Sequence, residues 1–105
     1  ELYWTDACGK AFQQIYDGLQ PPATRADAPP LHWMLSEYWK TVSSAFAGHP
    51  AVLAYEVMNE PWYGDVLADP LLLIEGGVAE KKNVGPFMER MHGVIRQNDP
   101  TTPVL

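Results

Sequence analysis

The stretch from Val52 to Trp62 constrains the fold of this chain more than any other part of the sequence. Ala51 to Met58 is apolar at every position except Glu56. A run that is apolar on both faces is typical of a strand in a parallel sheet that helices cover on both sides. Residues 59–61, Asn-Glu-Pro, follow at once, and proline stops further ladder pairing. The run therefore predicts a strand of an α/β protein that ends in polar residues.

The position of Asn59 and Glu60 indicates chemistry, because sites in parallel α/β folds lie beyond the carboxyl ends of the strands. Side chains alternate along a strand, so Glu56, Met58 and Glu60 share one face. We expect Glu56 to lie deep and Glu60 to lie at the rim. A buried Glu56 requires a cationic or hydrogen-bonding partner, which an earlier strand would supply, and a structural role is favoured for it.

Residues 55–61, Tyr-Glu-Val-Met-Asn-Glu-Pro, resemble the strand-4 motif of glycoside hydrolase family 5 and of the wider clan of (β/α)8 retaining glycosidases. Residues 61–65, 69–74 and 83–87 are similar to the endoglycoceramidase branch of that family. The resemblance runs from about residue 33 to residue 105. It implies an α/β fold, a partial (β/α)8 TIM barrel with the helices before strand 4, strand 4, the following loop and helix, and the start of strand 5.

The same resemblance sets an expectation for the extent of the domain. A (β/α)8 barrel needs on the order of 250 residues, whereas this chain has 105. We therefore expect residues 1–105 to be a fragment of a single glycoside hydrolase catalytic domain. The chain does not begin with Met and opens without a signal peptide, so its natural start is expected upstream. A secreted or lysosome-like compartment is expected from the family only.

The resemblance implies a retaining O-glycosyl hydrolase that cleaves the bond between oligosaccharide and ceramide in glycosphingolipids. Glu60 would be the acid/base, Asn59 would hold the sugar 2-hydroxyl, and Trp62 and Asp65 would bind substrate. Retaining enzymes need a second carboxyl about 5–5.5 Å away, whereas Glu56 lies roughly 13 Å down the strand. The nucleophile, a Glu at the end of strand 7 in the family, is expected outside this chain, so the segment alone is expected to be inactive.

Two alternative functions remain open at this point. The Asn-Glu-Pro core is shared with cellulases and mannanases, so the substrate of the hydrolase would then be a β-glucan. In the other alternative, the chain is a small non-catalytic carbohydrate-binding α/β module in which Trp62 and Tyr63 grip a sugar. Four carboxylates of the loop after Pro61 are expected to serve solvation: Asp65, Asp69, Glu75 and Glu80. For Asp65, solvation is the alternative to substrate binding.

Composition excludes several classes of partner. Thirteen acidic residues against seven basic ones give a formal charge of −6, and the bases are scattered, so a nucleic-acid footprint is missing. No apolar run approaches the roughly 18 residues of a membrane span. Cys8 is the single cysteine, and no Cys/His cluster has the spacing of a metal site, so we expect neither a disulfide nor a metal or other cofactor. The expected partner is a carbohydrate or glycolipid substrate, and the oligomeric state is left open.

Apolar residues at helical spacing predict two helices before the strand and one after it. The first is capped by Thr5 or Asp6 and ended by Gly18, and the second covers residues 31–46. A proline-rich loop at residues 20–30 joins them. The third helix is opened by Pro86 and broken at residues 98–100. Three aromatic residues of the second helix are expected to be core or sheet-covering rather than sugar-stacking: Trp33, Tyr38 and Trp39.

The connection from Pro61 to Pro86 is far longer than the usual βα loop of about 2–6 residues, and long loops are usually functional. It contains the apolar run Leu-Leu-Leu-Ile at residues 71–74. In one interpretation this run lies beside the cleft and touches a lipid or aglycone. In the other it clamps the loop onto neighbouring helices.

Overall fold

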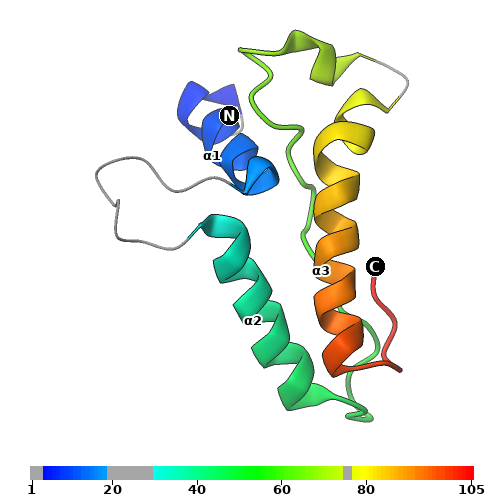
Figure 1. Cartoon of the computed structure of the whole chain (residues 1–105). Helices are drawn as coiled ribbons and strands as arrows, with labels where there is room; N and C mark the ends of the chain where they lie inside the picture. The colour runs from blue at the N-terminus through cyan, green and yellow to red at the C-terminus, as the bar shows by residue number, and fades with distance from the viewer. Residues whose placement is uncertain (1–3, 19–29, 75–76) are drawn as a thin grey trace.

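The computed structural model describes residues 4–18, 30–74 and 77–105, and the regular structure of these residues is helical (Figure 1). Helices α2 (Leu31–Phe46) and α3 (Gly85–Asn98) pack side by side, and α1 (Asp6–Asp17) lies near one end of the pair. Two short turns complete the regular structure: the 3-10 turn η3 (Pro70–Leu73) and the π-helical turn η4 (Glu80–Val84), which runs directly into α3.

Helices α1 and α2 form where the sequence predicts them. At the start of α1, Thr5 Oγ1 accepts a hydrogen bond from the Cys8 amide at 3.2 Å, which satisfies one of the unpaired donors of the first turn. At its end, Gly18 takes the left-handed conformation and donates its N–H to the carbonyls of Gln14 and Ile15. Most of the predicted proline-rich loop at residues 20–30 lies outside the described residues.

The strand predicted over residues 51–58 is wrong for the described part of the chain, which contains one parallel bridge, Tyr55 to Val104, and no regular strand. Around it, the Tyr55 N–H donates to the Pro103 carbonyl at 2.9 Å, and the Leu105 N–H donates to the Tyr55 carbonyl at 2.8 Å. A regular strand forms only where further extended segments lie alongside it and pair with its backbone N–H and C=O groups. The described residues are thus mostly helical, and the expected partial barrel is reduced here to a single bridge.

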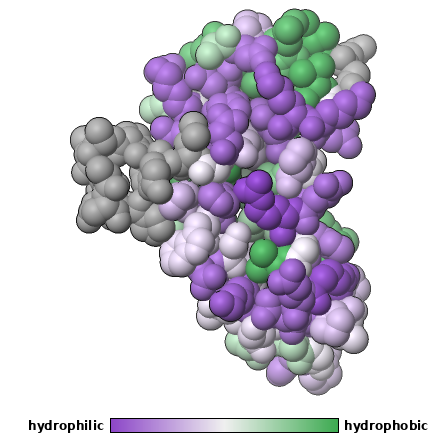
Figure 2. Space-filling model, in the orientation of Figure 1, coloured by the Kyte–Doolittle hydropathy of each residue, from purple (hydrophilic) through white to green (hydrophobic). Residues whose placement is uncertain are grey.

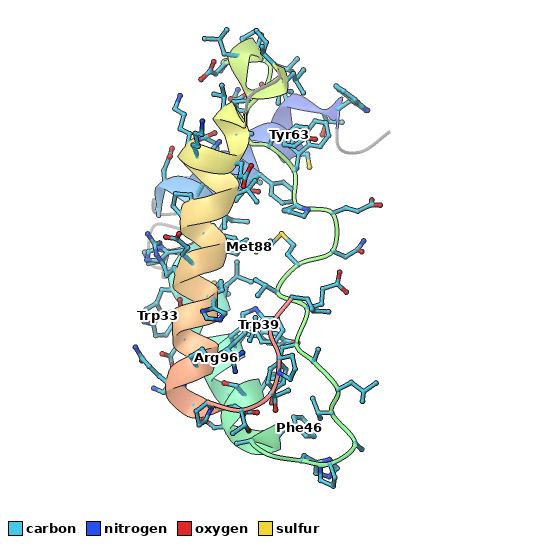
Figure 3. The ribbon with its side chains drawn as sticks, turned by 90° about the vertical axis from the view of Figure 1, so that its right-hand side faces the viewer. Trp33, Trp39, Phe46, Tyr63, Met88 and Arg96 are labelled. Carbon is cyan, nitrogen blue, oxygen red and sulfur yellow. The ribbon has the colours of Figure 1, made fainter. Side chains whose placement is uncertain are left out.

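The core explains which face of this extended segment is buried. Tyr55 and Val57 point into a cluster with Trp39 of α2 and with α3 residues that include Met91 and Ile95. Tyr55 meets the Trp39 ring edge-on, with centroids 6.0 Å apart, and Figure 3 shows Trp39 beside the extended segment. The core prediction is therefore correct for Trp39, the aromatic residue of α2 that faces the cluster.

The residue between Tyr55 and Val57 faces outward. Glu56 is exposed, so the prediction that it lies deep is wrong. The reason is that α2 and α3 cover one face only, so the alternation of a strand buries Tyr55 and Val57 and exposes what lies between them. Leu53 is 86% exposed although alternation would place it on the face of Tyr55, because it lies beyond the cluster that buries Tyr55 and Val57. Trp33 and Tyr38 are also exposed, contrary to the core prediction for them.

A buried carboxylate ties the end of α3 to this segment. Asp99 is completely buried, and its carboxylate accepts hydrogen bonds from the Tyr55 hydroxyl at 3.0 Å and from the Thr102 hydroxyl at 2.6 Å. The backbone amides of Thr101 and Thr102 also donate to it, each at 3.1 Å. These donors, with the Thr102 hydroxyl foremost, hold the pKa of Asp99 well below its usual range. The charge is thus satisfied by hydrogen bonds.

The π-helical turn depends on a glycine. The Gly85 N–H donates to the Glu80 carbonyl, five residues back, and a Cβ on Gly85 would lie 2.5 Å from that oxygen. Any other residue would force the turn open. Gly93, farther along α3, has open space where its Cβ would stand.

We expect Gly85→Ala to lower the free energy of unfolding by about 1–3 kcal/mol, as overpacking does. Gly93→Ala is the matched control, since the same exchange in a helix with free space stabilises by roughly 0.5–1 kcal/mol. Denaturant unfolding of both variants of the full-length protein measures the difference. Equal stabilities for the two variants would contradict the role of Gly85.

We also predict the pH dependence of stability that Asp99 contributes. Its folded pKa is depressed, so its contribution is complete above the unfolded pKa of about 3.9 and is lost as the pH falls through the lower, folded value. The difference in melting temperature between wild type and Asp99→Asn should therefore be constant from pH 7 to about pH 5 and shrink below about pH 4. Asp6→Asn, at an exposed pair with Lys10, is the control and should change little.

Candidate functional site

An open pocket of about 480 Å³ lies where the extended segment leaves the core. Its lining comprises Glu60, Pro61, Trp62, Tyr63, Glu80 and Val84. Glu60 and Trp62 are two of the predicted site residues, and the pocket brings them together with residues of η4. The lining therefore combines carboxylates with aromatic and aliphatic side chains, which is the composition that an orienting polar group in an apolar cavity requires.

Glu60 has an unusual backbone. Its φ is 45°, which makes it the one non-glycine residue of the described segments in the left-handed region. This conformation costs roughly 1–2 kcal/mol for an L-residue, and Pro61 further restricts the residue before it. Such backbones concentrate at active sites, where the surroundings hold them in place. The Glu60 side chain is exposed and therefore open to a ligand.

Aromatic rings form one wall of the pocket. The Trp62 and Tyr63 rings stack with centroids 5.6 Å apart and planes inclined by 27°. Trp4, just before α1, meets Trp62 edge-on at 4.9 Å. Tyr63 is 44% exposed and offers an apolar ring with a polar tip at the surface (Figure 3). This wall can pack against the flat apolar face of a bound molecule beside Glu60.

Asn59 and Asp65, the other two predicted site residues, do not line the pocket. Asn59 is exposed next to Glu60. Asp65 is buried, and its carboxylate accepts a hydrogen bond from the Ala68 amide at 3.1 Å, so in this structure it stabilises a turn. Glu75 lies outside the described residues.

Glu80 and the side chains that hold the loop were missed by sequence reasoning. Glu80 is exposed, as its predicted solvating role requires, and it also lines the pocket from the start of the π-helical turn. Tyr16 donates its hydroxyl proton to the Trp62 carbonyl from α1, and burial raises the pKa of this hydroxyl, so it keeps its proton. These contacts join residues far apart in the sequence, so no periodicity shows them.

A second pocket of about 320 Å³ adjoins the first and shares Tyr63 and Glu80 with it. The remainder of its wall is Leu72, Leu73, Ile74, Gly77, Val78 and Ala79. Leu72 is buried against Val66 and Ala79, so it packs the long connection onto itself rather than onto α1, α2 or α3. Its neighbours Leu71, Leu73 and Ile74 are exposed and form an apolar ridge. Figure 2 shows apolar surface at the end of the molecule where η3 lies.

The ridge is anchored by an ion pair. Asp69 caps η3 by accepting from the Leu71 amide at 3.3 Å, and its other oxygen lies 2.7 Å from Lys82 Nζ in η4. The hydrogen bond from Lys82 holds the pKa of Asp69 below its usual value. η3 therefore stays against η4, which places the apolar ridge next to the pocket that contains Glu60.

The described segments show neither a metal centre nor a membrane-spanning helix. No group of His, Cys, Asp or Glu within them could hold a metal ion. Among the helices described, none is long and apolar enough to cross a membrane.

Two curated proteins match the chain in sequence. A protein named endoglycoceramidase from Hydra vulgaris is 36% identical over 99 residues, which cover 94% of this chain and 17% of that protein. A second protein of that name, from Cyanea nozakii, is 36% identical over 102 residues, 94% of this chain and 18% of its own. The chain thus spans less than a fifth of the length of the curated relatives that it matches. No protein-family model and no solved structure matches it.

Proposed function

We propose that the protein that contains this chain is a retaining glycoside hydrolase of the endoglycoceramidase type, in which Glu60 is the acid/base. The observation that carries the proposal is the meeting of Glu60, Trp62 and Tyr63 on one open pocket. The similarity to two proteins named endoglycoceramidase over 94% of the chain supports it. The substrate would be a glycosphingolipid, cleaved between oligosaccharide and ceramide.

In this reaction Glu60 acts twice. Protonated, it gives its proton to the ceramide oxygen while the bond from that oxygen to the sugar breaks and a nucleophilic carboxylate bonds to the sugar. As a carboxylate, it then takes a proton from the water that releases the sugar from the nucleophile. The nucleophile would be a Glu from outside these residues, as in family 5.

We further propose that residues 1–105 belong to one (β/α)8 catalytic domain. The bridge between Tyr55 and Val104 supports this, because Tyr55 donates to residue 103 and accepts from residue 105, as one residue of a parallel pair does. Asn59 and Trp62 would bind the sugar, and Asn59 would hold the 2-hydroxyl of that sugar. Asp65 would act on substrate only indirectly, through the turn that its carboxylate caps.

The apolar ridge of Leu71, Leu73 and Ile74 favours a lipid aglycone over a β-glucan. A glucan is polar throughout and gains little from exposed aliphatic side chains, whereas ceramide has alkyl chains that remove apolar area from water when they pack there. The ridge adjoins the pocket through Tyr63 and Glu80, so one molecule with a sugar and a lipid part can contact both.

We expect Glu60→Gln in the full-length protein to reduce hydrolysis of a glycosphingolipid by about 10²–10⁴-fold, because the amide cannot protonate the leaving oxygen. The rate measured by release of oligosaccharide checks this. Glu37→Gln, an exchange of the same kind on α2 away from the pocket, is the control and should leave the rate unchanged. A near-normal rate for Glu60→Gln would remove this residue from the mechanism.

We expect the double variant Leu71→Ser and Leu73→Ser to lower kcat/KM for a glycosphingolipid in mixed micelles by about tenfold or more, since each apolar side chain buried contributes about 1.5–3 kcal/mol. Hydrolysis of a soluble aryl glycoside should be unchanged. Leu53→Ser, at an exposed leucine elsewhere, is the matched control. Equal losses on both substrates would contradict lipid contact, and preferential cleavage of a soluble glucan by the wild type would favour the cellulase-like alternative.

A further inference from the structure

The backbone that follows Glu60 is held by side chains from two distant elements. The Trp62 carbonyl accepts from the Tyr16 hydroxyl, and the Tyr63 carbonyl accepts from Asn83 Nδ2 at 2.7 Å. The Asp65 amide in turn donates to Gln13 Oε1 at 3.3 Å. Three of the four residues at 62–65 are therefore fixed by polar side chains, two from α1 and one from η4.

Gln13 and Asn83 also bind each other. Asn83 Nδ2 donates to Gln13 Oε1 at 3.1 Å, and Gln13 Nε2 donates to Asn83 Oδ1 at 3.3 Å, across 70 residues of sequence. Asn83 is 2% exposed, so this amide is buried and its donors and acceptor are used. A buried polar pair of this kind specifies one arrangement, because any shift leaves a polar atom unpaired.

The amide pair lies directly against the loop. Gly64 has a φ of 117°, and a Cβ at this position would lie 2.4 Å from Gln13 Oε1 and 2.6 Å from Asn83 Nδ2. No side chain fits between the loop backbone and the pair. Asn83 is the buried residue of the π-helical turn, so the pair approaches the loop backbone from η4 as well as from α1.

The geometry points to Gln13 and Asn83 as positioning residues that fix the Trp62–Tyr63 wall beside Glu60. The Trp62 carbonyl is held by Tyr16 of α1, and the Tyr63 carbonyl is held by Asn83 of η4. This inference rests on the proposed function, since it assigns the wall to the binding of the sugar part of the substrate. Neither residue touches the pocket, so both act through the loop.

Asn83→Asp in the full-length protein tests the inference, because it preserves volume but removes the donor to the Tyr63 carbonyl. Two readouts are needed: the 19F resonance of Trp62 in 5-fluorotryptophan-labelled protein, assigned through Trp62→Phe, and the separate values of KM and kcat on a glycosphingolipid. We expect the Trp62 resonance to shift and KM to rise about tenfold or more. The loss of one hydrogen bond that holds the wall corresponds to a change in KM of about that size.

Asn98→Asp is the matched control, since Asn98 also donates to a carbonyl, that of Val94 at 2.8 Å, but at the far end of α3. It should leave both readouts unchanged. A lower melting temperature for Asn83→Asp with an unchanged Trp62 resonance and KM would overturn the inference and leave the pair a stabilising role only. Because the resonance needs no catalysis, a shift together with full activity of Glu60→Gln would sink the proposed function and uphold the positioning of the wall.

Gln13→Ala keeps the test decisive should Asn83→Asp fail to fold. It removes one partner of the pair but retains the bond from Asn83 to the Tyr63 carbonyl. The shift of the Trp62 resonance and the rise in KM should then be smaller than for Asn83→Asp where that variant folds, and still larger than for Asn98→Asp. Values for Gln13→Ala equal to those of the control would overturn the inference.

Discussion

The burial of one face of the extended segment at residues 51–58 is the constraint on which the rest of this structure depends. Tyr55 and Val57 pack on Trp39, Met91 and Ile95, so the segment joins α2 to α3. Its hydroxyl gives Tyr55 a second attachment, because Asp99 needs that donor for a carboxylate that is completely buried. Apolar packing sets which face is inside, and the hydrogen bond to Asp99 sets which residue lies opposite Val104.

The pairing of Tyr55 with Val104 also fixes where the chain after residue 58 begins. The chain leaves the core at Glu60. At residues 62–65 its backbone forms hydrogen bonds with side chains of α1 and η4. The candidate site is therefore assembled from three parts of the sequence that only the tertiary fold brings together. The ion pair of Asp69 and Lys82 holds η3 to η4. The apolar ridge therefore lies beside the pocket that η4 helps to line.

The sequence predicted those features that depend on residues close together in the chain, and it missed those that depend on distant contacts. α1 and α2 were predicted with their ends because caps and a 3.6-residue period are local signals. The regular strand and the burial of Glu56 were wrong because both depend on what pairs with and covers the segment. Glu60 and Trp62 were found through a motif, whereas Gln13 and Asn83 meet across 70 residues and leave no periodic signal.

The strained backbone of Glu60 is explained by the attachments on either side of it. A left-handed glutamate persists only where its surroundings over-determine the chain path. Upstream, Tyr55 is fixed by Asp99 and Val104, and downstream, the Trp62 carbonyl is fixed by Tyr16. The side chain of Glu60 takes no part in either attachment and stays exposed. Because the strain is held by neighbours rather than by the carboxyl itself, that carboxyl remains exposed at the pocket that it lines.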